Sequence, residues 1–235
     1  MLAEPSVGPL STVNAQCVFM IDRQALAFFA PALDRLATRL VALGVGADVL
    51  TGLGFALGLV SAALIAWGEP QAALVFLVAS RLLDGLDGAV ARRTQPTDRG
   101  AFLDISLDFL FYASIPLAFA LADPPANALA ASVLLAAFMG TGSSFLAFAV
   151  LAERRGLSSA AYPRKGFYFL GGLTEGTETL LCFVLMCLWP AGFSRLALGF
   201  SVLCGFTIAT RLVAGCSLLA QPAGATLPQR DSPGE

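Results

Sequence analysis

Six long apolar stretches follow one another along the chain, separated by short polar segments. Each approaches the roughly 20 residues that an α-helix needs to cross the hydrocarbon core of a bilayer. The pattern therefore predicts an all-α polytopic membrane protein with six transmembrane helices. These predicted spans lie at about residues 49–67, 71–92, 100–122, 127–152, 174–190 and 196–219.

The segment before the first span, residues 22–43, has a different pattern, in which apolar residues alternate with charged ones. This favours an N-terminal amphipathic helix lying in the membrane interface, and it equally fits an amphipathic helix packed on protein. Residues 1–21 have no basic segment before a hydrophobic run, so we expect a flexible tail and no cleaved signal peptide. We expect one membrane domain at 22–220 and a disordered tail at 221–235.

The composition agrees with this pattern and narrows the chemistry. Hydrophobic residues make up 57% of the chain and charged residues 13%, and the mean hydropathy is +0.78. The net charge of −2 gives no reason to expect a nucleic-acid partner. Because the chain has no histidine, any general base must be a carboxylate or a lysine. The five cysteines have no CxxC spacing and fit small apolar residues of the helices.

Four aspartates interrupt the second and third spans. Asp84 and Asp87 are three residues apart, and Asp104 and Asp108 are four apart, so each pair occupies one face of a helix. A charged side chain within a membrane helix costs about 2.5–3.5 kcal/mol on insertion scales. An antiparallel pair of these helices would bring the four carboxylates together. Oxygen ligands of this kind select hard divalent cations such as Mg²⁺ or Mn²⁺, which would compensate the charge.

The aspartates could also serve as ion-pair partners or as a channel filter. Ion pairs with Arg81 or Arg92 would account for Asp84 and Asp87 but leave Asp104 and Asp108 without partners, so this interpretation is disfavoured. A cation channel or carrier could use a cluster of carboxylates as its filter. That alternative explains the charges but not their spacing.

The spacing has a specific resemblance. DGLDGAVAR and GAFLDISLD resemble the signature of the CDP-alcohol phosphotransferases, DxxDGxxAR followed by GxxxDxxxD. Every fixed position matches: Asp84, Asp87, Gly88, Ala91, Arg92, Gly100, Asp104 and Asp108. Seven residues separate Arg92 from Gly100, where the usual pattern has eight. The sequence ADVLT at 47–51 also resembles the family's PNxLT, with alanine and aspartate in place of proline and asparagine.

The resemblance implies an integral-membrane transferase of phospholipid biosynthesis. Such an enzyme moves a substituted phosphate group from a CDP-alcohol, such as CDP-diacylglycerol, to an acceptor alcohol and releases CMP. It implies a two-metal site for Mg²⁺ or Mn²⁺, with Asp108 as the catalytic base, and a homodimer. The implied metal ligands are Asp84, Asp87, Asp104 and Asp108. The implied CDP-binding residues are Asp84, Asp87, Gly88, Ala91, Arg92 and Gly100.

The later spans are expected to bind the acceptor. Arg164, Lys165 and Arg211 favour an acceptor that carries a phosphate, such as a polyol or sugar phosphate, because a free arginine within a span calls for an anion. Glu175 and Glu178 suit an amine or hydroxyls of the acceptor, and they equally suit a pairing with Arg211. Anchoring to lipid headgroups is the simpler role for the loop residues Arg164 and Lys165.

The basic residues also predict the orientation. They concentrate before the first span, between the second and third, and between the fourth and fifth, whereas the opposite side carries only Arg195. Because basic loops remain in the cytoplasm, both termini and the carboxylate site are expected to face it, in a membrane of the bacterial inner-membrane type.

Overall fold

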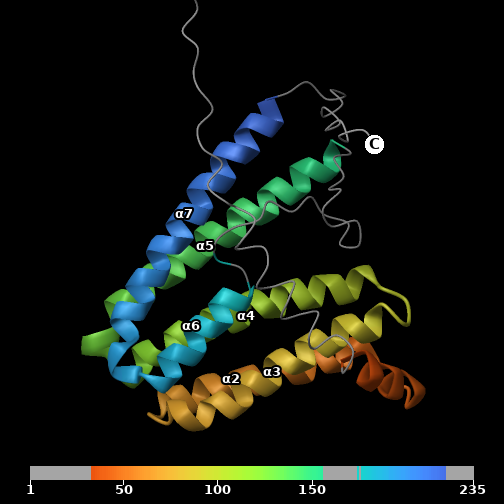
Figure 1. Ribbon diagram of the computed structural model, residues 1–235, viewed down its shortest axis with the longest axis horizontal. Helices are drawn as coiled ribbons and strands as arrows, with labels where there is room; N and C mark the ends of the chain where they lie inside the picture. Colours follow the sequence, from red (N-terminus) through yellow and green to blue (C-terminus); the bar gives the residue numbers. More distant parts are fainter. Residues whose placement is uncertain (1–32, 156–173, 175, 221–235) are drawn as a thin grey trace, which may run out of the picture.

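A computed structural model describes residues 33–155, 174 and 176–220 (Figure 1). Every regular element among these residues is helical. The predicted tails 1–21 and 221–235 and the start of the amphipathic segment, 22–32, lie outside the described residues. The elements are the described helical residues 33–42, α2 (Ala47–Ala66), α3 (Pro70–Ala91), α4 (Asp98–Ala122), α5 (Pro124–Arg154), α6 (Gly176–Leu188), the 3₁₀-helix η1 (Pro190–Gly192) and α7 (Phe193–Ala220).

These helices confirm an all-α membrane protein with several spans. Among the described residues, α2, α4, α5 and α7 with the preceding η1 are long and apolar enough to cross a bilayer. The other two predicted spans correspond to α3 and α6. α3 has 22 residues but carries Arg81, Asp84 and Asp87, and α6 has only 13 described residues.

The helices form two arms that meet at one end (Figure 1). α2, α3 and α4 run close together in the first arm, and α5 and α7 run side by side in the second, with α6 between them. Short connections force neighbours to be antiparallel: α2 turns into α3 within Trp67–Glu69, where Gly68 adopts a positive φ of 86°. The consequence for the aspartates is that α3 ends and α4 begins at the same end of the first arm.

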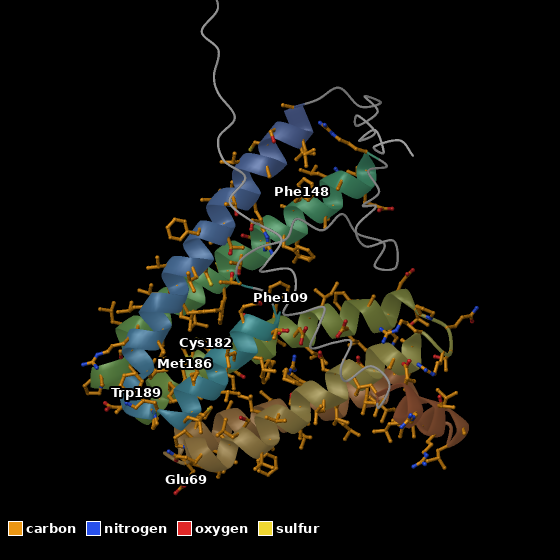
Figure 2. The ribbon with its side chains drawn as sticks, viewed as in Figure 1. Glu69, Phe109, Phe148, Cys182, Met186 and Trp189 are labelled. Carbon is orange, nitrogen blue, oxygen red and sulfur yellow. The ribbon has the colours of Figure 1, made fainter. Side chains whose placement is uncertain are left out.

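Aromatic side chains hold the two arms together where α4, α5 and α6 meet. Phe111 and Phe183 are fully buried, with ring centroids 6.2 Å apart. Phe138 of α5 lies 6.1 Å from Phe183, and the buried Met186 extends this core along α6 (Figure 2). Such T-shaped pairs contribute about 0.5–1.5 kcal/mol beyond their buried area. They fix the rotation of α4, and Asp108 lies less than one turn before Phe111 on that helix.

Small residues let α2 approach α3 and α4 closely. A Cβ added at Gly54 would lie 3.2 Å from the carbonyl oxygen of Ser80. One added at Gly58 would lie 2.5 Å from Cδ2 of Phe111, closer than any real contact allows. Close approach through glycine is typical of helix pairs in membranes. It brings the start of α2 to the level of the aspartates on α3.

The described half of the amphipathic segment packs on protein. Leu33, Ala37 and Leu40 contact the apolar face formed by Leu86 and Val90 of α3 and their neighbours. An ion pair between Arg93 Nη1 and Asp34 Oδ1, 2.9 Å apart, ties this helix to the turn after α3. Of the two interpretations of residues 22–43, packing on protein is therefore the one that the described residues show, beside the end of α3.

Candidate active site

Three of the four predicted aspartates come together between α3 and α4. One carboxylate oxygen from each of Asp84, Asp104 and Asp108 lies within 4.8 Å of the other two, and all three residues are half-buried. Opposite oxygens around an octahedral Mg²⁺ are about 4.2 Å apart, so only a small adjustment of these side chains would enclose an ion. The prediction that the two helices share one acid cluster is confirmed for these three residues.

The fourth aspartate, Asp87, is held from α2. Its side chain is buried, and its Oδ2 accepts a hydrogen bond of 2.5 Å from Oγ1 of Thr51. Thr51 is the last residue of the ADVLT segment. The resemblance of that segment to the family's PNxLT was therefore a signal for this contact, although the sequence did not predict Thr51 as a site residue. The first residues of α2 are therefore part of the site, together with α3 and α4.

The remaining motif residues surround the turn between α3 and α4. A Cβ at Gly88 would lie 3.2 Å from Nη1 of Arg92, which caps α3 and is exposed. At Gly100 it would lie 3.1 Å from both Oδ1 of Asp48 and Oγ1 of Thr97. Thr97 caps α4 by accepting a bond of 3.0 Å from the amide of Gly100. Both glycines therefore lie where an added side chain would press on polar neighbours beside the acids.

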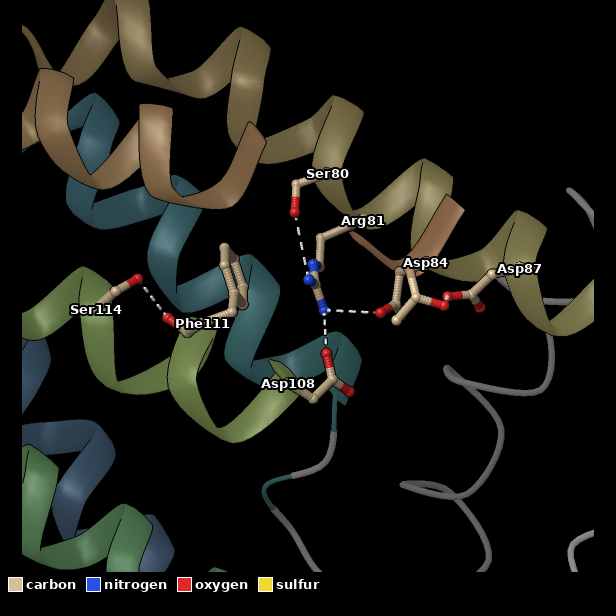
Figure 3. A network of polar contacts seen from close by, with 8 residues as sticks. Ser80, Arg81, Asp84, Asp87, Asp108, Phe111 and Ser114 are labelled. Carbon is tan, nitrogen blue, oxygen red and sulfur yellow. Dashed lines mark hydrogen bonds and ion pairs between the residues drawn. The ribbon is translucent and has the colours of Figure 1, made fainter. Parts of the chain in front are cut away.

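Arg81 makes the main ionic contacts of the cluster (Figure 3). Its Nη1 donates to Oδ1 of Asp108 at 2.7 Å and lies 3.4 Å from Oδ1 of Asp84. The guanidinium also lies over the ring of Phe111, 3.9 Å from its centroid. The expectation that an ion pair would leave Asp108 without a partner was therefore wrong, because Arg81 reaches across from α3 to α4.

The predicted acceptor residues are only partly within the described structure. Arg164, Lys165 and Glu175 lie outside the described residues. Arg211 of α7 is 9% exposed, and its Nη1 donates to the carbonyl oxygen of Thr141 at 3.1 Å. One donor of Arg211 thus already binds α5, and its role toward the acceptor stays a prediction. Glu178 lies half-buried in the first turn of α6.

A series of neighbouring residues extends from the helix of Arg211 towards the acids. Thr174 donates to Oγ1 of Thr207 at 3.0 Å, one turn before Arg211 on α7. Just beyond Thr174, a Cβ at Gly176 would lie 3.5 Å from the hydroxyl of Tyr112. The ring of Tyr112 is in turn 5.8 Å from the guanidinium carbon of Arg81. The start of α6 therefore lies between Arg211 and the acid cluster.

Comparison with known proteins identifies this arrangement. The family model for CDP-alcohol phosphatidyltransferases matches residues 45–214. The chain belongs to the CDP-alcohol phosphatidyltransferase family. The match includes all eight motif residues, and it gives no support to the alternative of a cation channel or carrier. The class of enzyme predicted from the motif is confirmed.

The chain is also similar to named proteins. The chain is 53% identical to the inner membrane protein YnjF of Escherichia coli over 196 residues, which cover 83% of this chain and 95% of that one. It is 40% identical to an archaetidylinositol phosphate synthase of Methanothermobacter thermautotrophicus over 84 residues (35% and 40% of the two chains). A phosphatidylcholine synthase of Pseudomonas aeruginosa is 35% identical over 79 residues (32% and 33%).

A solved structure has the same fold. The phosphatidylinositol phosphate synthase of Mycobacterium tuberculosis, determined with CDP-DAG bound, superposes with a TM-score of 0.64. The alignment covers 84% of this chain and 98% of that one, at 22% identity. The helical architecture is therefore that of a known membrane synthase.

The contact between Thr51 and Asp87 yields a test of the site's construction. Thr51→Val keeps the side-chain shape but removes the hydroxyl donor, which leaves a buried carboxylate without it. We expect a loss of about 1–3 kcal/mol in the free energy of unfolding, measured by thermal unfolding in detergent. Thr210→Val is the matched control, because among the described residues the Thr210 hydroxyl binds only carbonyls of its own helix. Equal effects of the two substitutions would contradict a role for Thr51 in holding Asp87.

Proposed function

We propose that the protein transfers a substituted phosphate group from a CDP-linked lipid, such as CDP-diacylglycerol, to the hydroxyl of an acceptor alcohol and releases CMP. The observation that carries this proposal is the meeting of Asp84, Asp104 and Asp108 at motif positions of the family. The CDP-DAG bound in the structural neighbour from M. tuberculosis supports a lipid donor.

The proposed reaction assigns a task to each motif residue. Asp84, Asp87 and Asp104 would hold two divalent ions, Mg²⁺ or Mn²⁺, with Asp108 able to add an oxygen. When bound, such ions neutralise charge on the phosphate oxygens during an in-line displacement. The acceptor oxygen forms a bond to phosphorus as the bond to CMP breaks, and the carboxylate of Asp108 takes the hydroxyl proton.

The rest of the donor fits the turn between α3 and α4. Gly88, Ala91 and Gly100 would line the nucleotide, and the exposed guanidinium of Arg92 supplies a cation suited to its phosphates. This segment connects two helices of the acid cluster through only a short turn, so a diphosphate at the acids and a cytidine at the turn can belong to one ligand.

A CMP-release assay on purified protein with CDP-diacylglycerol tests the proposal. Asp84→Asn and Asp104→Asn should abolish CMP release, because each removes a metal ligand. Asp108→Asn should lower turnover by about 10²–10⁴-fold, the contribution typical of a positioned general base. Glu69→Gln, an exposed carboxylate between α2 and α3 at the other end of the first arm (Figure 2), is the control that should keep full activity. Full activity in excess chelator would refute the metal site.

For the acceptor, we propose an alcohol that bears a phosphate, such as a polyol or sugar phosphate. The start of α6 lies between the acids and the buried Arg211. Because a guanidinium has several donors, Arg211 can bind a phosphate while keeping its bond to Thr141. The names of two similar proteins, synthases of phosphatidylinositol phosphate and archaetidylinositol phosphate, agree with such an acceptor. The phosphatidylcholine synthase favours the rival, an amino alcohol bound by Glu175 and Glu178.

The two acceptor classes predict different effects of Arg211→Ala. If the acceptor carries a phosphate, its KM should rise by about 10–100-fold, the loss of a charge-assisted contact of roughly 1.5–3 kcal/mol, whereas the donor's KM should change little. Arg195→Ala, which removes an exposed arginine at the start of α7, is the matched control. CMP release with only amine-bearing or uncharged alcohols, together with rescue of Arg211→Ala by Glu175→Gln, would establish the rival.

The protein's place in the cell is proposed from its relatives and its helices. The inner membrane location of the E. coli relative supports the same membrane for this chain, with membrane lipids around residues 22–220. A homodimer is proposed from the resemblance to the family, and the mass of the purified protein in detergent tests it.

We propose that the acid cluster and both termini face the cytoplasm, because basic residues concentrate at the turn after α3. With the native cysteines removed, Thr97→Cys should react with an impermeant thiol reagent only after cells are opened. Labelling of intact cells would place the site on the opposite side. Glu69→Cys is the matching positive control, and it should react in intact cells, since the turn that contains Glu69 lies at the other end of α3.

A further inference from the structure

Arg81 lies outside the family signature, yet it contacts two members of the acid cluster. It stands one turn before Asp84 on α3, and its side chain is 11% exposed. The bond from its Nη1 to Oδ1 of Asp108, 2.7 Å long, joins α3 to α4. Asp108 offers this oxygen to the guanidinium, and its second oxygen is not used in that bond. The proposed base therefore has one oxygen fixed by protein.

The guanidinium is itself held on three sides. Its Cζ lies over the ring of Phe111, 3.9 Å from the ring centroid, and its Nη2 donates to Oγ of Ser80 at 3.3 Å. Phe111 cannot move away, because it is fully buried and packs against Gly58 of α2, where a Cβ would have no room. The position of Arg81 is therefore fixed by the packing of α2 against α4.

Stability alone does not account for this placement. Nε of Arg81 is buried and has no hydrogen-bond partner among the described residues. An unpaired buried donor costs about 1–3 kcal/mol, so this placement does not satisfy all the donors of Arg81. A catalytic role is one explanation of such a buried group, and it fits the position of Arg81 beside Asp108.

We propose that Arg81 is a positioning residue of the transfer reaction, an inference that rests on the proposed function. It fixes Oδ1 of Asp108 so that Oδ2 is presented to the acceptor hydroxyl. Its positive charge also weakens the attraction of the three clustered carboxylates for divalent cations. Arg81 thus keeps the metal affinity of the acids lower than their charge alone would give, and it keeps the base in place.

Removing Arg81 should strengthen metal binding but slow the reaction. Simple damage to the fold would weaken both, so one variant distinguishes the two explanations. Arg81→Met keeps much of the side-chain volume but removes the charge and all donors. Mn²⁺ should bind at least about tenfold more tightly, because a cation within ion-pair distance of the ligands has been removed. The kcat should fall by about 100-fold, the effect of a reacting group misplaced by about 1 Å, while the donor's KM stays close to that of the parent protein.

Lysine separates charge from geometry. Arg81→Lys keeps the positive charge but has no planar fork to lie on Phe111 while it binds both Ser80 and Asp108. This variant should bind Mn²⁺ with the affinity of the parent protein and still show a lowered kcat. Arg81→Gln serves in place of Arg81→Met if the methionine variant does not fold, as judged by its melting temperature in detergent.

The experiment measures Mn²⁺ binding by calorimetry and CMP release by steady-state kinetics, on the same purified full-length variants. Arg93→Met is the matched control: it removes an arginine–aspartate ion pair outside the acid cluster, and it should leave Mn²⁺ affinity unchanged. Tighter Mn²⁺ binding together with a lower kcat in Arg81→Met supports the proposal.

Three results would overturn the proposal. Weaker or unchanged Mn²⁺ binding in Arg81→Met, with lower activity, would mean that Arg81 is merely structural. An unchanged kcat would show that Asp108 needs no positioning by Arg81. These two results would leave the proposed function intact, whereas failure of the parent protein to bind Mn²⁺ would overturn the metal site and this inference together.

Discussion

Burial of like charges in an apolar protein is the constraint on which this structure depends. Three half-buried carboxylates with oxygens within 4.8 Å of one another repel one another. Within the described part of the chain, the guanidinium of Arg81 offsets part of this repulsion, and the hydroxyl of Thr51 stabilises the neighbouring carboxylate of Asp87. The charge of one guanidinium does not balance three carboxylates, so the cluster retains an attraction for cations. The electrostatic imbalance is thus what the proposed chemistry requires.

The helix packing places this imbalance in one location. Glycines at 54 and 58 allow α2 to approach α3 and α4, and that approach brings Thr51 to Asp87 and supports Phe111 beneath Arg81. The short turn with its cap at Thr97 then returns the chain so that Asp104 and Asp108 face Asp84. Small residues and one capped turn therefore determine the site as much as the acids do.

The sequence was sufficient to predict where the helices lie and which acids form the cluster. Hydropathy located α2 at 49–67, against Ala47–Ala66 in the structure, because an apolar span of bilayer length leaves little choice of ends. Helical periodicity predicted that each pair of aspartates lies on one helix face, and antiparallel packing of the two helices predicted that Asp84 and Asp108 would share a site. The partners of these acids were harder to predict. Arg81 can turn toward its own helix or across to α4, and only the position of Phe111 decides between the two. The bond from Arg211 to Thr141 was not predicted for a similar reason, since a backbone carbonyl has no signature in sequence.

Phe111 takes part in both the aromatic core and the acid site. Its ring packs on Phe183 of the central core, 6.2 Å away, and the same ring supports the guanidinium that holds Asp108. Three contacts, through Phe111 and Arg81, thus connect Phe183 of α6 with the proposed base. Substitutions in that part of α6 and substitutions at Asp108 will not have additive effects, because they share this side chain. Evolution or engineering of a new acceptor preference through α6 must therefore preserve the volume around Phe111, or the change in specificity will also alter the chemistry.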